Sequence, residues 1–177
     1  FKQALNYGPE EALKPQLWVG VVNVLFTIVA IKTIDSWGRK PLLLMGTAGM
    51  FIGLMALGLA INNQHFGMIS VIGVMIFVGS FAMSMGPVVW VMLAEIFPNN
   101  VRGLAMSIVI GVQCLASALV TNGFPILNKS QLNTASFNGA LPYFIFALIC
   151  VLAILFVCWR VPETKGKTLE QMEKLWN

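Results

Sequence analysis

Five long apolar stretches, separated by short polar breaks, set the pattern of the chain. Each is close to the ~20 residues that an α-helix needs to cross the hydrocarbon core of a bilayer. Because lipid offers no hydrogen bonds to the backbone, such segments cross it as helices. The pattern therefore predicts an all-α membrane protein with five spans, at residues 16–34, 42–61, 67–94, 104–127 and 139–159.

The composition also favours a membrane protein. Hydrophobic residues make up 58% of the 177 residues and charged residues only 10%, with a mean hydropathy of +0.82. A soluble domain averages about 25% charged residues, and it would have no interior for so much apolar surface. The expected partner is the lipid bilayer, and no nucleic acid is expected.

The basic residues set the expected topology. Most of the 11 Lys and Arg residues lie in the breaks at 35–41 and 95–103 and in the tail at 160–177, which the positive-inside rule assigns to the cytoplasm. We therefore expect residues 1–15 to begin outside, residues 16–159 to form one five-helix bundle, and the C-terminal tail to be cytoplasmic. The expected location is the plasma or inner membrane.

Residues typical of catalytic or metal sites are sparse. Cys114, Cys150 and Cys158 fall inside spans without the spacing of a zinc site or a disulfide framework, and His65 has no ligand at suitable spacing. The sequence contains no Walker loop, no H-E-x-x-H and no G-x-S-x-G motif. We expect no enzyme, no bound metal and no cofactor.

The segment GPVVWVMLAEIFPNNVRG at 86–103 combines a breakable helix with charges at a membrane boundary. Pro87 removes a backbone hydrogen bond and predicts a kink next to Trp90. Glu95 and Arg102 follow where the apolar stretch ends, a place where an unpaired charge is costly and a paired one can act as a latch. The plainer interpretation is that these charges only anchor the topology.

Two amide side chains stand nearly alone within their spans. Asn23 and Gln113 must each face another helix or a hydrated cavity, because hydrocarbon satisfies none of their hydrogen bonds. They therefore either bond across helix interfaces or line a path for a polar solute. Trp90 has similar alternatives, since its indole can stack on a sugar ring or pack against a neighbouring helix.

Three motifs in order resemble those of the sugar porters of the major facilitator superfamily: DSWGRKP at 35–41, the segment at 86–103, and VPETKGKTLEQME at 161–173. The resemblance runs from about Tyr7 to the end of the chain. It implies the C-terminal helical bundle of a twelve-helix transporter, with the five spans as helices 8–12. Residues 1–15 are then the remnant of the seventh helix and an outer loop, and the N-terminal transmembrane bundle is missing.

The resemblance also implies roles for individual residues. It places a tryptophan, a glutamine, an asparagine and a glycine at the sugar, which correspond to Trp90, Gln113, Asn23 and Gly86. It further implies ion pairs that close a cytoplasmic gate, formed by acids and arginines that correspond to Asp35, Arg39, Glu95, Arg102 and Glu163.

The function implied by the resemblance is secondary active transport of a monosaccharide, a pentose or a hexose, by alternating access. Sugar–proton symport driven by the proton gradient is the expected form, although no residue of this chain matches the proton carrier. Two alternatives stay open, an uncoupled sugar facilitator and a truncated remnant that does not transport.

Overall fold

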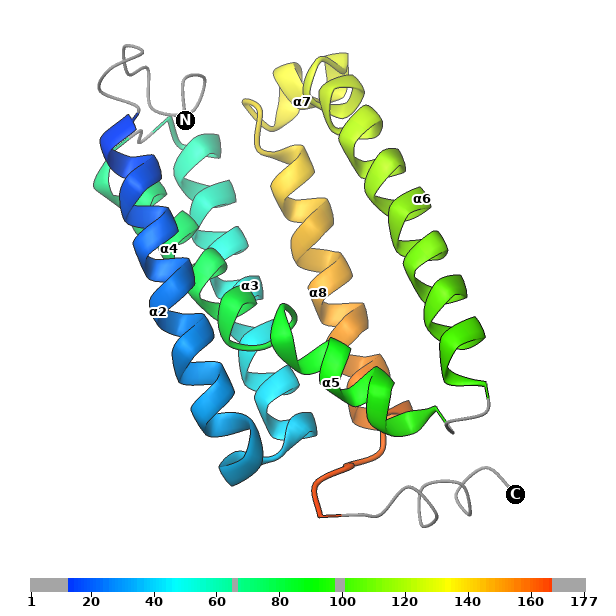
Figure 1. Cartoon of the computed structure of the whole chain (residues 1–177). Helices are drawn as coiled ribbons and strands as arrows, with labels where there is room; N and C mark the ends of the chain where they lie inside the picture. The colour runs from blue at the N-terminus through cyan, green and yellow to red at the C-terminus, as the bar shows by residue number, and fades with distance from the viewer. Residues whose placement is uncertain (1–12, 65–66, 98–100, 167–177) are drawn as a thin grey trace.

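The structure is a computed structural model that describes residues 13–64, 67–97 and 101–166. Within these residues it contains helices and no strands (Figure 1). The expectation for residues 1–15 and most of the C-terminal tail lies outside the described residues. The helices are α2 (Leu13–Trp37), α3 (Arg39–Asn62), α4 (Met68–Met83), α5 (Pro87–Ile96), α6 (Arg102–Asn128), α7 (Gln131–Ser136) and α8 (Leu141–Arg160).

The predicted all-α membrane architecture with five spans is confirmed. Five helical segments are long and apolar enough to cross a membrane, and they coincide with the five predicted stretches. The break expected at residues 35–41 is much shorter than predicted, because α2 ends at Trp37 and α3 begins at Arg39. Gly38 alone turns the chain, with a φ of 95° that side-chain-bearing residues rarely adopt.

The third span is broken where the sequence predicts a kink. Helix α4 ends at Met83 and α5 begins at Pro87, and the two lie in one apolar stretch from Met68 to Ile96. Pro87 has no N–H to donate, and the Gly86 N–H instead reaches back to the Phe81 carbonyl oxygen at 3.0 Å. Helix α5 is therefore a short unit with its own start.

Helix α3 is the centre of the bundle and packs against both α4 and α8. Its glycines, which include the G-x-x-x-G at 49–53, allow this close approach. A Cβ atom on Gly53 would lie 2.7 Å from the Gly73 carbonyl oxygen of α4, and one on Gly49 would lie 2.2 Å from Ser80 Oγ. The backbones of α3 and α4 could not approach this closely with larger side chains.

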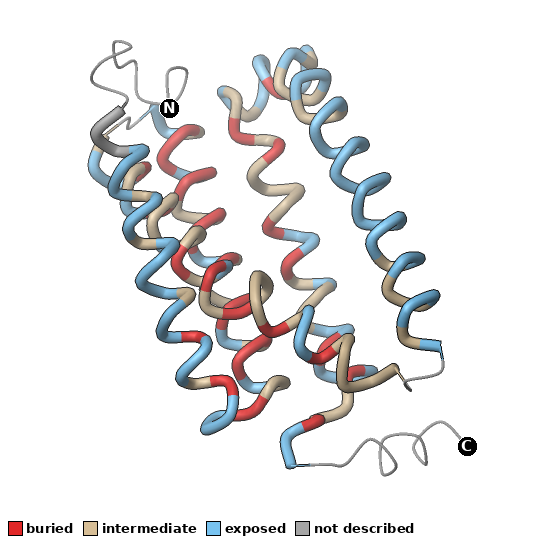
Figure 2. Tube along the Cα trace, viewed as in Figure 1, coloured by how far each residue is buried: buried red, intermediate tan, exposed pale blue. Residues whose placement is uncertain are grey.

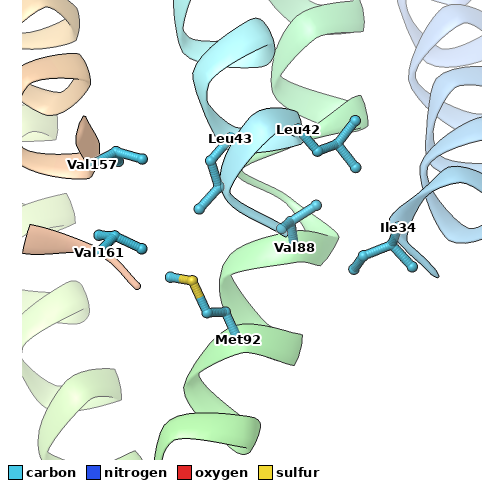
Figure 3. Close-up of a cluster of buried hydrophobic side chains, with 7 residues drawn as sticks. All are labelled: Ile34, Leu42, Leu43, Val88, Met92, Val157 and Val161. Atoms are coloured by element: carbon cyan, nitrogen blue, oxygen red, sulfur yellow. The ribbon is translucent and has the colours of Figure 1, made fainter. Parts of the chain in front are cut away.

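One buried apolar cluster joins α2, α3, α5 and the end of α8. Figure 3 shows the side chains that these four segments contribute to the cluster. Leu42 and Val88 are fully buried, and Met92 of α5 is 7% exposed. The cluster holds α5 against the rest of the bundle, and it consists of Ile34, Leu42, Leu43, Val88, Met92, Val157 and Val161.

Helix α6 stands apart from the other spans. It contains no buried residue, and Figure 2 shows it as exposed along most of its length. Its clearest contacts come from Phe124, whose ring lies 6.2 Å from that of Phe146 and 6.1 Å from that of Tyr143, both on α8. In a bilayer, the rest of α6 is a surface for lipid or for other helices.

The polar break at 128–138 contains the short helix α7, which the sequence analysis did not predict. Ser130 caps its start by accepting the Asn133 N–H at 3.3 Å. Asn133 is fully buried, and its amide donates to the Asn128 carbonyl oxygen at 2.9 Å and accepts the Leu141 N–H at 2.9 Å. This asparagine therefore joins α6, α7 and α8 at one end of the bundle.

Candidate functional site

The four predicted sugar contacts lie on different elements, and none is buried. Asn23 lies on α2, Trp90 on α5 and Gln113 on α6, while Gly86 forms the break before α5. Trp90 is 37% exposed. Within the described residues, the side-chain amides of Asn23 and Gln113 make no hydrogen bond to protein. Their polar groups are therefore available to an external partner.

An apolar cavity of about 510 Å³ lies between α3, α4, α6 and α8, and it includes none of the four predicted sugar contacts. A pyranose carries a hydroxyl on most of its carbons, and this lining offers almost no polar partner to satisfy them. The cavity is thus unsuited to a sugar. Its lining residues are Met50, Leu54, Leu57, Val74, Phe77, Phe81, Met85, Phe124, Tyr143, Phe146, Ile149 and Cys150.

The acids and arginines gather at the opposite end of the bundle from α7. Arg39, the first residue of α3, donates two hydrogen bonds to the Glu95 carboxylate of α5. One runs from Nη2 to Oε1 at 2.6 Å and the other from Nε to Oε2 at 3.2 Å. Its Nη2 also lies 3.1 Å from Asp35 Oδ1 at the end of α2. We call Asp35, Arg39 and Glu95 the charge cluster.

The side chains of the charge cluster differ in exposure, and this difference decides which of the two ion pairs of Arg39 is the more stabilising. The Arg39 side chain is 12% exposed and that of Glu95 is 30% exposed, whereas that of Asp35 is 80% exposed. An exposed pair contributes little, because water and salt screen it. The two-point bond between Arg39 and Glu95 is partly shielded and is the stronger link.

Glu163 lies just beyond α8 and caps the start of α3. Its carboxylate accepts the N–H groups of Arg39, Lys40 and Lys165, each at 3.0 Å. The first N–H groups of a helix have no partner within the helix, and the positive end of the helix dipole favours an anion there. Glu163 thus binds backbone rather than an arginine side chain.

The surroundings of Glu163 shift the pKa of its carboxyl group. Partial burial raises the pKa of this carboxyl, but the backbone N–H groups of Lys165, Arg39, Lys40 and Thr164 together outweigh that effect and leave the pKa below its ordinary value of 4.5. Gly38 leaves room for the carboxylate, since a Cβ atom there would lie 2.9 Å from Glu163 Oε2.

Arg102 lies apart from the charge cluster. Its Nε donates to the Phe97 carbonyl oxygen at 3.2 Å, across the loop between α5 and α6. Of the five residues predicted for the gate, the structure brings Asp35, Arg39, Glu95 and Glu163 together around the start of α3. Arg102 instead closes a local turn at the start of α6.

Thr164 is a further polar residue of this site that the sequence analysis missed. It is 3% exposed, and its Oγ1 donates to Glu95 Oε2 at 2.6 Å. The sequence carried one signal for it, its place directly after Glu163 in the motif at 161–173. Its partner is 69 residues away in the chain, and only the fold reveals that contact.

Comparison with known proteins identifies the family. Residues 5–176 match the family described as "Sugar (and other) transporter". The chain belongs to this sugar transporter family. This bundle is 44% identical over 174 residues to the D-xylose-proton symporter of Escherichia coli, and 38% identical over 174 residues to the glucose facilitated diffusion protein of Zymomonas mobilis.

The sugar transporter bundle also matches solved structures of its relatives. It superposes on the proton:xylose symporter XylE bound to 6-bromo-6-deoxy-D-glucose with a TM-score of 0.89 and 45% identity, covering 100% of this chain and 37% of that one. The two curated relatives are covered over 98% of this chain and over 35% and 37% of their own lengths. The chain thus spans about a third of the length of the transporters it matches.

Proposed function

We propose that this chain is the C-terminal bundle of a secondary transporter that moves a monosaccharide across the plasma or inner membrane by alternating access. The similarity supports the class of substrate, since the named relatives carry xylose or glucose. The sugar would lie between this bundle and an N-terminal one, because transporters of this kind bind substrate where two repeats meet near the membrane midplane. The C-terminal tail would be cytoplasmic.

The observation that carries this proposal is the construction of α5. This ten-residue helix begins at a break in the third span, presents an exposed Trp90, and ends with Glu95 bound to Arg39 and Thr164. A candidate sugar contact and a candidate gate therefore belong to one short rigid element. Movement of α5 at its break would couple the two.

Three of the four candidate sugar contacts carry side chains that suit such a site. Asn23, Gln113 and Trp90 all present side chains to the outside of the bundle and are not enclosed within it. A bundle that shares its site with a second bundle needs its ligating groups on its surface. The free amides would donate and accept hydrogen bonds from sugar hydroxyls, and the indole would stack on the ring.

The gate would act through the charge cluster and Glu163. The bonds between Arg39 and Glu95 hold α5 against the start of α3, and those of Glu163 hold the segment after α8 against the same helix start. These bonds would break when the cytoplasmic end opens. An interaction present in only one of two states shifts the equilibrium by its own free energy. The charge cluster would therefore favour the state that is closed to the cytoplasm.

Two relatives of this family differ in how transport is driven, and both forms remain candidates. The first is sugar–proton symport, as the name of the Escherichia coli relative states, and the second is facilitated diffusion, as the name of the Zymomonas mobilis relative states. We favour symport, because the identity is 44% to the symporter and 38% to the facilitator. A bundle that does not transport is the third candidate.

The test is a chimera in which this chain replaces the matched region of the Escherichia coli symporter. Uptake of labelled xylose and glucose is measured in cells without other transporters for these sugars, with and without a protonophore. Accumulation that collapses with the protonophore shows that this bundle works with a proton-coupled N-terminal half, and equilibration that ignores the protonophore favours a facilitator. An inserted chimera that moves neither sugar contradicts the proposed function.

A further inference from the structure

Thr164 is buried where the segment after α8 meets α5. Its hydroxyl donates to Glu95 Oε2, the same oxygen that accepts the Arg39 Nε at 3.2 Å. A hydroxyl bonded to a carboxylate makes a short, charge-assisted bond, and 2.6 Å is in that range. The carboxylate is therefore held by two groups, with the guanidinium on both oxygens and the hydroxyl on Oε2.

The backbone that carries Thr164 is itself fixed. The preceding residue, Glu163, accepts the N–H groups of Arg39 and Lys40 at the start of α3. Two neighbouring residues thus bind two different helices, because Glu163 binds the start of α3 and Thr164 binds Glu95 of α5. We call this pair the clasp.

We propose that Thr164 is a positioning residue of the cytoplasmic gate, whose hydroxyl orients the Glu95 carboxylate toward Arg39 and ties α5 to the segment after α8. This role rests on the proposed function. Opening of the gate by movement of α5 requires the bond to Thr164 to break together with the ion pair. Loss of the hydroxyl alone therefore favours the open state, even though both charges remain.

The first measurement needs no sugar and uses this chain itself in lipid nanodiscs. Hydrogen exchange of the peptides that cover 93–97 and 161–165 reports how often α5 leaves the clasp. In Thr164→Val, which keeps the shape and removes the hydroxyl, exchange in both peptides should rise about fivefold, as expected for one hydrogen bond to a charged group that is partly solvated. Thr164→Ser restores the hydroxyl and should bring the exchange rate back toward that of the parent chain.

Thr47→Val is the matched control. Thr47 is also buried, but its hydroxyl bonds within its own helix, to the Leu43 carbonyl oxygen at 2.7 Å. This variant should leave the exchange of both peptides unchanged. In a Glu95→Ala background, Thr164→Val should add no further effect, because the acceptor is gone.

The second measurement separates this proposal from the proposed function. In the chimera, Thr164→Val should lower the rate of sugar exchange across the membrane while the sugar Kd stays within about twofold, since the hydroxyl does not contact sugar. Unchanged hydrogen exchange in Thr164→Val, or equal effects of Thr164→Val and Thr164→Ser, overturns the positioning role. Absence of uptake by the parent chimera overturns the proposed function and leaves the hydrogen-exchange result as the judge of Thr164.

Discussion

Replacing Gly38 with alanine tests how the fold joins α3 to the clasp. Gly38 turns the chain with a φ of 95° and a ψ of 163°, a region essentially reserved for glycine. Its added Cβ would also lie 2.9 Å from Glu163 Oε2 and 3.1 Å from Glu163 Cδ. The substitution therefore strains the backbone and displaces the carboxylate that caps α3.

The expected cost has two parts. A non-glycine residue in this conformation costs about 1–3 kcal/mol. Displacement of an anionic cap from a helix start costs about 1 kcal/mol more. We expect a total near 3 kcal/mol, which corresponds to a fall in Tm of about 6–12 °C for a chain of this size.

The assay is thermal unfolding of the purified chain in detergent, followed with a thiol-reactive dye. Cys150 is buried and becomes reactive when the bundle opens, whereas Cys114 and Cys158 are exposed and set the baseline. Gly20→Ala is the matched control, because nothing lies within 4 Å of its added Cβ. Its Tm should not fall.

A second background separates the two parts of the cost. In Glu163→Ala the carboxylate is absent, so Gly38→Ala should then cost only the backbone strain. A Tm for Gly38→Ala within 2 °C of that of Gly20→Ala would refute the reasoning. Equal costs in both backgrounds would refute the contact with Glu163.

Three further predictions follow from the same geometry. The pKa of Glu163 is lowered in the folded chain, so its contribution to the free energy of unfolding is present above its ordinary pKa of 4.5 and is lost as the pH falls through the lower folded value. Glu163→Gln should therefore be less stable than the parent chain at neutral pH, and its Tm should fall less steeply below about pH 4.5. A pH profile of Tm equal to that of the parent chain would contradict this. Glu95→Gln weakens the ion pair with Arg39 and should slow sugar exchange in the chimera about tenfold, with little change in sugar Kd. Arg102→Ala should slow sugar exchange much less. A larger loss of exchange rate in Arg102→Ala than in Glu95→Gln would place the gate elsewhere. Trp90→Ala should weaken sugar binding by about tenfold, because one stacking contact is lost. Trp159→Ala, which changes an exposed tryptophan of α8, is the control. Normal sugar binding by Trp90→Ala would show that the indole is not part of the site.

The long apolar spans were predictable because hydropathy over about 20 residues is a strong signal that needs no knowledge of packing. The break before α5 was also predictable, since Pro87 acts on its own helix through a missing N–H. The tight turn at Gly38 was less so. A glycine between charged residues suggests a loop, and only the fold shows that one residue suffices.

The contacts of the charge cluster depend on residues far apart in the chain. The motifs singled out Arg39, Glu95 and Glu163, but sequence alone did not reveal that Glu163 binds backbone N–H groups 124 and 123 residues away. Thr164 gave no signal beyond its place in the motif at 161–173, because a buried threonine has many possible partners. Helix α7 had a local signal in its Ser130 cap, which is weak over six residues.

Sugar uptake by the chimera in which this chain replaces the matched region of the Escherichia coli symporter tests the proposed function most directly. We expect uptake of xylose or glucose that falls when Glu95 is changed to glutamine and when Trp90 is changed to alanine, while the Trp159→Ala control keeps the parent rate. A chimera that is inserted and folded, yet moves neither sugar, would contradict it.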